Sequence, residues 1–531
     1  MQIIIKNKKI QSLFINLMFF VFVYLIFGYN FNTLDDLIYS KLVANDYLSV
    51  YSFQWISYLC HGLNKLLPSI NAWGLLLVFI TYLSCSKLFC FILKKEKTKV
   101  NVVLYSLYFL IVFWILYQLQ FTIVSSLALS VGTLCINDYI KCKDKENLIV
   151  GIILFVFGFC IRKEGIVFIL PLIALLMFEN IQIKNKTFFI KQLVLFGVLT
   201  SILTISSGID IKMYPEEYKD YIKFNDLRTE ISDKRIDNLP LIQQMGSVSI
   251  NDYLTLGYWM YNDYEYMTEE RFKNIIIDLD KAINEQQLGV WCKAFFTVCH
   301  SLFISSYFWI ILFLLFGFEK NKKNHLLILL SMIGFIVVFI LINRIAYRTL
   351  FGSFLPLIVY LLLTINKIKS NKLTPSILIC LLLIVTCFSY SFYEQDKIES
   401  NEFIHTYDYE LKTNPENLYY ITLHAAIMEE GKMPVLLKNS KTHYGNGLLN
   451  AWVQKHPIET NMLNEFNIKN PLKELPYKEK FYLITDKNEQ ECYLISQWHK
   501  EHYNTDIICK KEKESKDYII WTLKEKGENN E

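Results

Sequence analysis

The stretch NAWGLLLVFITYLSCSKLFCFILKKEKTK, residues 71–99, decides the class of this protein. Its first part, 71–93, carries one charged side chain, Lys87, and the lysine-rich segment 94–99 follows directly. A helix of about 20 residues is roughly 30 Å long, which matches the hydrocarbon core of a bilayer. The stretch therefore predicts a transmembrane helix that ends in a charged loop.

The same pattern recurs along the chain. The 531 residues are 53% hydrophobic and 15% aromatic, and the apolar residues are concentrated in blocks with few charges. This distribution is typical of a polytopic membrane protein. We expect an all-α bundle of about eleven transmembrane helices, at 11–28, 71–93, 100–117, 120–137, 148–161, 165–178, 190–207, 296–317, 325–342, 349–366 and 373–391.

Lysine-rich segments between alternate blocks predict the direction of the helices. The positive-inside rule places such segments in the cytoplasm, and they occur at 6–9, 94–99, 141–147, 184–191, 319–325 and 366–372. The first block shows no small-residue cleavage site, so we expect a retained helix with its N-terminus inside. The C-terminus is then outside, and the long loops 29–70 and 208–295 are also outer.

Other functional classes find little support. The basic residues form no concentrated face for nucleic acid. The twelve cysteines include no CxxC pair, and most of them lie in apolar blocks,. Cys492 and Cys509, near the C-terminus, could form a disulfide. No Walker loop, HExxH, GxSxG or EF-hand pattern occurs, and the scattered histidines predict no metal site,.

The segment FNTLDDLIYS, residues 31–40, places Asp35 and Asp36 just beyond the first predicted span. Two acids in the first turn of a helix interact favourably with its dipole, which is the ordinary interpretation. At the mouth of a membrane bundle, a carboxylate can also orient or deprotonate an acceptor hydroxyl. The sequence does not rank the two aspartates. Apolar residues at helical spacing in loop 29–70 predict amphipathic helices along the membrane surface.

Two further segments place charges between apolar blocks. Arg162, Lys163 and Glu164 separate two short blocks, as in helices interrupted around a polar site, although a hairpin turn with snorkelling side chains is the plain alternative,. Arg344 and Arg348 are four residues apart and so share one helix face. Their guanidinium groups suit a phosphate, although interfacial anchoring explains either arginine singly.

The two largest outer segments are expected to fold. In loop 208–295, residues 267–284 predict a helix capped by Thr268, and the mixture of acids and aromatics is compatible with sugar binding but also with a packed surface loop,. After residue 392, apolar runs at 418–423, 434–439, 480–486 and 517–524 alternate with helical stretches such as 491–503, which predicts an α/β domain,. We therefore divide the chain into a membrane domain, 1–391, and an extracytoplasmic domain, 392–531.

Five stretches together resemble a known family: LDDLIYSKLVAND, RKEGIVFILPLI, FNDLRTEISDKRID, SINDYLTLGYW and GLLNAWVQKHP. With the retained first helix and the outer tail, the layout resembles the integral-membrane glycosyltransferases of C-type fold (GT-C). More narrowly, it resembles bacterial polytopic proteins of surface-polysaccharide contexts.

The resemblance implies a transferase on the outer face of the bacterial cytoplasmic membrane. Such an enzyme moves a sugar from a polyprenyl-phosphate donor to a glycan, lipid or protein acceptor. By analogy, Asp35 or Asp36 is the catalytic base. Arg162, Arg344 and Arg348 bind the donor phosphate, and Lys163 and Glu164 support them. Some members use a divalent metal such as Mg or Mn and others none, so this point stays open.

Two alternatives to the transferase are compatible with many spans. A polysaccharide polymerase or ligase also carries outer arginines, but the long acidic first loop and the folded tail are less expected there. A lipid-linked sugar transporter or flippase should show an inverted repeat with paired interrupted helices, which this sequence lacks.

Overall fold

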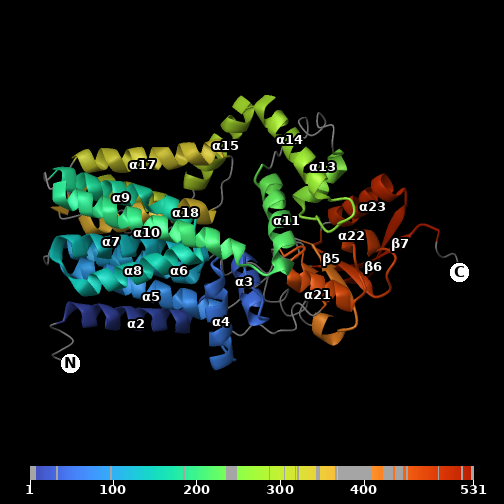
Figure 1. Ribbon diagram of the computed structural model, residues 1–531, viewed down its shortest axis with the longest axis horizontal. Coiled ribbons are helices and arrows are strands. Elements are labelled where there is room, and N and C mark those ends of the chain that lie inside the picture. The colour runs from blue at the N-terminus through green and yellow to red at the C-terminus, as the bar shows by residue number, and fades with distance from the viewer. Residues whose placement is uncertain are drawn as a thin grey trace.

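The computed structural model shows a mostly helical protein with a helical bundle at one end and a smaller α/β part at the other (Figure 1). It describes residues 7–527 except 32–33, 96–98, 183–185, 235–247, 286, 304, 317, 320–321, 343–346, 365–366, 369–409, 423–434, 437–445, 450–452, 488 and 516–517.

The bundle helices coincide with the first ten predicted spans. They are α2 (Lys8–Phe27), α5 (Ala72–Leu93), α6 (Lys99–Tyr117), α7 (Phe121–Cys142), α8 (Lys145–Ile161), α9 (Gly165–Gln182), α10 (Lys186–Lys212), α15 (Gln287–Phe303), α16 (Ser306–Phe316), α17 (Lys322–Leu341) and α18 (Tyr347–Thr364). Most of them lie roughly parallel to one another, whereas α15 lies at an angle to the others (Figure 1). The predicted eleventh span, 373–391, lies outside the described residues. A two-residue antiparallel pair, β1 (Phe318–Glu319) with β2 (Lys367–Ile368), joins two of the connections.

Not every bundle helix is long enough to cross a membrane. Among the described residues, five are both long and apolar enough: α2, α5, α7, α10 and α17. The predicted span 296–317 is instead a pair of helices, α15 and α16, bent by 76°. Ser305 marks the break, because its Oγ donates to the carbonyl of Leu302 over 2.6 Å and closes the end of α15. A membrane-embedded helical bundle is therefore supported, whereas the number eleven stays a prediction.

Close packing of small residues holds the centre of the bundle together. A Cβ added to Gly132 on α7 would lie 2.8 Å from the carbonyl oxygen of Gly151 on α8, so the two backbones are in direct contact. Ser125 Oγ adds a 2.7 Å hydrogen bond to the carbonyl of Gly158. Small residues allow such approach where lipid offers no hydrophobic driving force between helices. As a result α7 is almost wholly buried, while α2, α10 and α17 expose apolar side chains outward.

The α/β part is built on a five-stranded sheet of order β4-β3-β5-β7-β6. Strands β4 (Gly447–Leu449), β3 (Leu418–Ile421) and β5 (Phe481–Thr485) are parallel, and β7 (Ile519–Glu525) and β6 (Ile507–Glu514) complete the sheet in antiparallel pairs. Three of the predicted strands and the predicted helix, observed as α23 (Gln490–Tyr503), are confirmed. Of the predicted strand 434–439, the described residues 435–436 form a turn.

Both faces of this sheet are covered by segments from elsewhere in the chain. The side chains of β3 alternate: Leu418 and Tyr420 pack toward α23, and Tyr419 and Ile421 pack toward the opposite face,. On the α23 side the core also includes residues of α11 (Glu216–Asp233), α13 (Ile250–Gly257) and α14 (Glu269–Glu285), so loop 208–295 folds together with the tail. The predicted helix after Thr268 is α14, and Thr268 Oγ1 accepts from the backbone N–H of Arg271 as its cap. Short helices α21 (Pro457–Glu465) and α22 (Pro471–Glu474) join β4 to β5.

The other face of the sheet is covered by the first outer loop. Its helix α3 (Leu34–Ala44) contributes Leu37, Ile38 and Leu42 to a core shared with Tyr419 and Ile520. The expectation that this helix lies along the membrane surface is wrong, because every described side chain from Asp36 to Val43 is buried. The second helix, α4 (Gln54–Leu66), does have one buried and one exposed face.

A short piece of the tail returns to the bundle. The backbone N–H of Val435 donates to the carbonyl of Tyr29 over 2.8 Å, and the carbonyl of Leu436 accepts from Asn71 over 3.3 Å. A Cβ on Gly74 would lie only 1.9 Å from the carbonyl oxygen of Val435. The tail is therefore fixed to the same end of the bundle that carries α3.

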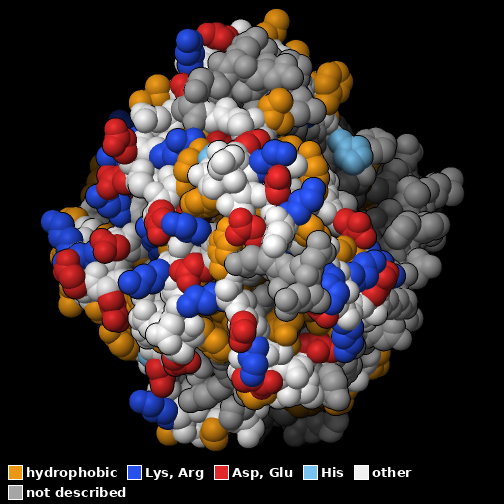
Figure 2. Space-filling view, turned by 90° about the vertical axis from the view of Figure 1, so that its right-hand side faces the viewer, with side chains coloured by type: hydrophobic (Ala, Val, Ile, Leu, Met, Phe, Trp, Pro, Cys, Tyr) orange, Lys and Arg blue, Asp and Glu red, His pale blue; other side chains and the backbone are white. Residues whose placement is uncertain are grey.

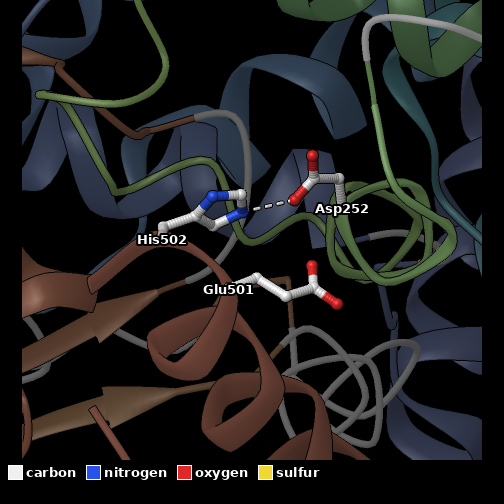
Figure 3. Close-up of side chains that lie close together, drawn as sticks. All are labelled: Asp252, Glu501 and His502. Carbon is white, nitrogen blue, oxygen red and sulfur yellow. Dashed lines mark hydrogen bonds and ion pairs between the residues drawn. The ribbon is translucent and has the colours of Figure 1, made fainter. Parts of the chain in front are cut away.

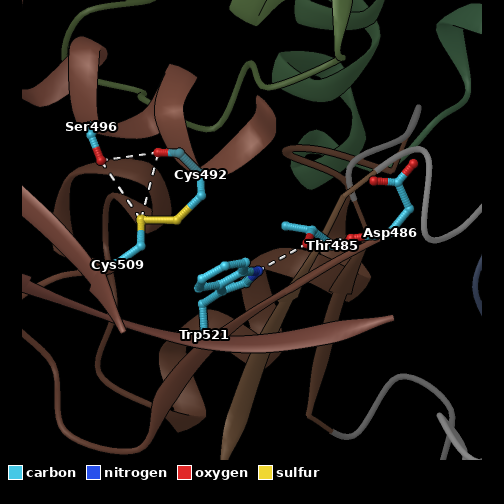
Figure 4. Close-up of a disulfide and its surroundings, with 6 residues drawn as sticks. All are labelled: Thr485, Asp486, Cys492, Ser496, Cys509 and Trp521. Carbon is cyan, nitrogen blue, oxygen red and sulfur yellow. Dashed lines mark hydrogen bonds between the residues drawn. A yellow bond between two sulfur atoms is a disulfide. The ribbon is translucent and has the colours of Figure 1, made fainter. Parts of the chain in front are cut away.

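The α/β part carries the marks of a water-exposed domain. Figure 2 shows Lys and Arg interspersed with Asp and Glu over this end of the molecule. Cys492 on α23 and Cys509 on β6 form a disulfide, which the sequence had allowed (Figure 4). Beside it, Trp521 Nε1 donates to Thr485 Oγ1 over 2.9 Å and ties β7 to β5. Disulfides persist in oxidising compartments and are rare in the cytosol.

Candidate functional site

The connections that the sequence assigned to the outer side meet at one end of the bundle. Phe31 forms a parallel bridge with Leu119 in the tight turn before α7. The backbone N–H of Phe53, just before α4, donates to the carbonyl of Cys160 near the end of α8 over 3.0 Å. Most of the predicted site residues are on these connections or on the helix ends beside them.

Asp36 is fully buried and supports the structure around it. Its carboxylate accepts hydrogen bonds from Trp73 Nε1 at 3.2 Å and from the backbone N–H of Phe121, the first residue of α7, at 3.2 and 3.3 Å. The Trp73 ring stacks on Tyr39 with 3.8 Å between centroids. A carboxylate at the positive end of α7 is electrostatically favourable. Asp36 thus joins α3, α5 and α7.

Asp35 has a different environment from its neighbour. Its carboxylate forms an ion pair with the guanidinium of Arg348 in the first turn of α18. The Asp35 side chain is 27% exposed and that of Arg348 is 23% exposed, so both groups are within reach of solvent. The structure therefore separates the two aspartates that the sequence could not rank, and it brings a candidate base into contact with a candidate phosphate ligand.

Arg162 lies beside the same end of α7. Its Nη1 donates to Thr122 Oγ1, and its guanidinium lies over the ring of Phe121, 5.1 Å from the centroid. Glu164 forms an ion pair with Arg162 at 3.6 Å. These charges lie in the turn between α8 and α9, as the hairpin alternative required, and Glu164 neutralises part of the charge of Arg162.

Lys163, in the same turn, faces α11. Desolvation raises the pKa of the Asp226 carboxyl on α11, and the nearby ammonium of Lys163 opposes that shift. The turn between α8 and α9 is therefore close enough to α11 for their charges to interact. Arg344, which the sequence analysis pairs with Arg348 as a phosphate ligand, lies outside the described residues.

Three residues near Asp35 were not singled out from the sequence. Tyr51 donates its hydroxyl proton to Asn225 Oδ1 over 3.0 Å, and Arg228 donates to the same oxygen. Burial raises the pKa of Tyr51, while the charge of Arg228 lowers it and that of Asp35 raises it further, so both charges act on the Tyr51 hydroxyl. Arg228 is itself fully buried and lies over the ring of Trp259, 5.2 Å from its centroid. The quoted stretch FNDLRTEISDKRID contains Asn225 and Arg228, but nothing in its pattern distinguishes them.

One group in the described part of the chain has ligand types suited to a metal ion. Asp252 on α13 and Glu501 and His502 on α23 place their ligand atoms within 4.8 Å of one another (Figure 3). However, Asp252 is already engaged, because it accepts from His502 Nε2 at 2.5 Å and from Arg271 at 3.4 Å. A guanidinium at that distance would repel a dication. The group is better explained as a polar link between α13 and α23, and no predicted site residue belongs to it.

The described site therefore centres on the pair of Asp35 and Arg348, with Tyr51 near Asp35, Arg162 and Lys163 in the turn between α8 and α9 beside the same end of α7, and Asp36 as a buried structural support. Its chemistry is that of an accessible carboxylate among several cations. No protein-family model, curated protein or solved structure was found to match this chain.

Proposed function

We propose that this protein is a GT-C-type glycosyltransferase that uses a polyprenyl-phosphate-linked sugar. The observation that carries the proposal is the ion pair between Asp35 and Arg348, at the end of an apolar bundle and beneath a folded polar domain. A lipid-linked donor suits this position, because its prenyl chain lies in the bilayer while its phosphate reaches the interface. Arginine is well suited to a phosphate, since it offers a bidentate fork.

The reaction assigns a separate task to each residue of the pair. The acceptor hydroxyl oxygen attacks the anomeric carbon of the donor sugar and forms the new glycosidic bond. The bond between that carbon and the phosphate oxygen breaks, and polyprenyl phosphate leaves with the electron pair. Asp35 takes the proton of the acceptor hydroxyl. Arg348 moves from Asp35 to the leaving phosphate and stabilises its charge.

The other charged residues complete the site. Arg162 is held by Thr122 and Glu164 next to α7, where it is available as a second phosphate ligand, and Lys163 adds a further cation on the side facing α11. Arg344 is proposed for the same role because it lies four residues before Arg348 in the sequence. Asp36 is a positioning residue in this scheme, because Trp73 and the N-terminus of α7 occupy its carboxylate.

The proposed location is the outer face of the bacterial cytoplasmic membrane, with the N-terminus inside and the C-terminus outside. Two independent features support this orientation. The lysine-rich segments fall between alternate predicted spans,. The disulfide between Cys492 and Cys509 is typical of an oxidising compartment, which favours an outer location for the α/β part,.

The proposal can be tested with the full-length protein in phospholipid vesicles. Polyprenyl-phosphate donors carrying radiolabelled glucose, galactose, mannose or N-acetylglucosamine are supplied with an envelope extract as acceptor. We expect one donor to release polyprenyl phosphate and transfer its label. Asp35→Asn should reduce the rate by roughly 100-fold or more, the usual contribution of a general base. Arg348→Gln should weaken binding of unmodified polyprenyl phosphate.

A matched control is Asp506→Asn, which removes an exposed carboxylate of the α/β part that pairs with Lys500. This variant should keep wild-type transfer. Full activity of Asp35→Asn, or no consumption of any donor by the wild type, would overturn the assignment. Movement of labelled donor across the membrane without cleavage of its sugar–phosphate bond would instead indicate a flippase.

A further inference from the structure

A cavity of about 620 Å³ lies in the extramembrane part between α11, the segment before α14, and α21. Cavities of this size accommodate small-molecule ligands. Its lining mixes aromatic, charged and amide groups, including Asp220, Phe224, Tyr264, Lys455 and Asn464. None of these residues takes part in the site at Asp35 and Arg348.

The ammonium of Lys455 is the most unusual group in this cavity. It lies over two aromatic rings, 4.7 Å from the centroid of Phe224 and 4.9 Å from that of Tyr264. Burial lowers its pKa, and the carboxylates of Asp220 and Glu459 act in the opposite direction. Among the described residues, no carboxylate lies within salt-bridge distance of Lys455 Nζ, so its donors are directed into the cavity or to water.

The backbone at Lys455 is held in a costly conformation. Its φ of 62° is in the left-handed region, which side chains other than glycine rarely adopt,. Buried Glu459 holds it there by accepting from the Lys455 backbone N–H, and Tyr264 donates to the same carboxylate over 2.5 Å. Strain of this kind persists where the surroundings fix a side chain in one place.

The composition of the cavity indicates the class of its ligand. Three acidic residues, Glu217, Asp220 and Glu269, are balanced by Lys223, Lys455 and Lys469. A strongly anionic or cationic ligand would face as many like as opposite charges. Hydroxyl groups, by contrast, both donate to carboxylates and accept from ammonium and amide groups. The apolar side chains of the lining offer contact to the C–H face of a sugar.

The position of the cavity relates it to the reaction. Helix α11 presents Asp220, Phe224 and Leu227 to the cavity. Its adjacent face carries Asn225, which accepts from the hydroxyl of Tyr51 near Asp35, and Arg228, which donates to the same Asn225 oxygen. Both faces belong to one helix, whose diameter with side chains is about 10 Å, so the cavity and the Tyr51 contact lie on neighbouring sides of α11. A chain of a few sugars is long enough to pass from one to the other.

We propose that this cavity binds an uncharged segment of glycan, namely the part of the acceptor that lies beyond the reacting sugar. The assignment to the acceptor rests on the proposed transferase function, whereas glycan binding in the cavity does not. Asp220 and Lys455 supply the polar contacts, and Asn464 adds an amide from α21.

The test is saturation-transfer NMR on the full-length protein in detergent micelles. The probes are neutral trisaccharides of glucose, galactose, mannose and N-acetylglucosamine, with a trisaccharide of galacturonic acid for comparison. We expect at least one neutral probe to bind. Asp220→Asn and Lys455→Gln should each weaken that binding about tenfold or more, because each removes a charged hydrogen-bonding group. Asp506→Asn should leave it unchanged.

Two further variants separate this proposal from the transferase. Asp35→Asn should abolish transfer and keep wild-type binding of the neutral probe. If Asp35→Asn stays fully active while the probe binds in the cavity, the transferase assignment fails and the cavity assignment stands. If no neutral probe binds, if only the acidic probe binds, or if Asp220→Asn and Lys455→Gln bind as the wild type does, the cavity assignment is overturned.

Discussion

The carboxylate of Asp35, in the first turn of α3, forms an ion pair with the guanidinium of Arg348, in the first turn of α18. The pair links the first outer loop to the last described helix of the bundle. Its neighbour Asp36 turns into the protein and binds Trp73 and the start of α7. Adjacent aspartates thus have separate roles, one at the surface of the site and one beneath it.

The first prediction follows from this difference in burial. Asp36→Asn removes a charged acceptor from two buried donors, which costs about 1–3 kcal/mol. Asp35→Asn breaks a partly exposed pair, which costs at most about 1 kcal/mol. Thermal unfolding of the purified protein in detergent should therefore show a clearly larger loss for Asp36→Asn. The opposite order would contradict the structural role assigned to Asp36.

Gly74 is the second point at which a single change should have a specific effect. An added methyl group would meet the carbonyl oxygen of Val435 at 1.9 Å, so Gly74→Ala must displace the segment that joins the tail to the bundle. We expect a lower unfolding temperature and faster proteolysis of the tail. Gly62→Ala on α4 is the matched control, because nothing lies within 4 Å of its added Cβ. Equal behaviour of the two variants would exclude the proposed contact.

The disulfide supports a prediction on stability. It closes a loop with a sequence separation of 17 residues, and loops of similar length are stabilised by about 3 kcal/mol in the chain-entropy description. Replacing both Cys492 and Cys509 by alanine should lower the unfolding temperature of the full chain. Cys142→Ala, which removes an exposed free thiol, should have little effect. A negligible loss in the double variant would show that the pairing contributes nothing to the fold.

The same cysteines provide a test of orientation. Cys142 is exposed and lies in the lysine-rich segment 141–147, which we place in the cytoplasm. In intact spheroplasts treated with a mild reductant, a membrane-impermeant maleimide should react with the partly exposed Cys509 and with the exposed Cys292 of loop 208–295, and not with Cys142. Labelling of Cys142 is the signal that the wild type shows and Cys142→Ala lacks. This signal should appear only after the membrane is opened. Labelling of Cys142 in intact spheroplasts would reverse the proposed topology.

His456 makes the contact between α21 and the first outer loop sensitive to pH. Its ring is buried, Nε2 donates to the carbonyl of Leu48 over 3.0 Å, and Nδ1 accepts from the N–H of Ile458. Burial lowers its pKa from 6.5 to about 3. Below about pH 6.5 the imidazole of His456 therefore binds a proton in the unfolded chain but stays neutral in the folded chain. The contribution of His456 to the free energy of unfolding consequently falls as the pH drops from 6.5 toward 3.

The measurement is the difference in unfolding temperature between the wild type and His456→Asn across this range. Asparagine can still cap α21 but does not titrate. The difference should shrink as the pH falls from 6.5. Buried Glu459, whose pKa burial raises to about 7, contributes a change of opposite sign between about pH 4.5 and 7, but it is present in both proteins and cancels,. A pH-independent difference would exclude the assignment to His456.

The local features of the fold could be predicted from the sequence. Apolar blocks, lysine-rich segments and alternating runs depend only on neighbouring residues, and they located ten helical segments, α14, α23 and three strands of the sheet. The short strand β4 and the lysine-rich strand β6 were missed, because neither has a hydrophobic alternation to detect,. The apolar block 296–317 predicts one continuous helix, because hydrophobicity along the chain carries no information about the 76° bend within the block.

The pairing of distant residues was decided only by the tertiary structure. The sequence placed Asp35, Asp36, Arg162 and Arg348 on one side of the bundle, but it could not say which aspartate is accessible or which arginine it meets. Those answers depend on α3, which the sequence predicts as a surface helix and which the fold buries between the sheet and the bundle. Helical periodicity reports how many faces of a segment are apolar and not which surface will cover them. Burial on all sides turns Asp36 inward to Trp73 and leaves Asp35 at the edge, where Arg348 reaches it.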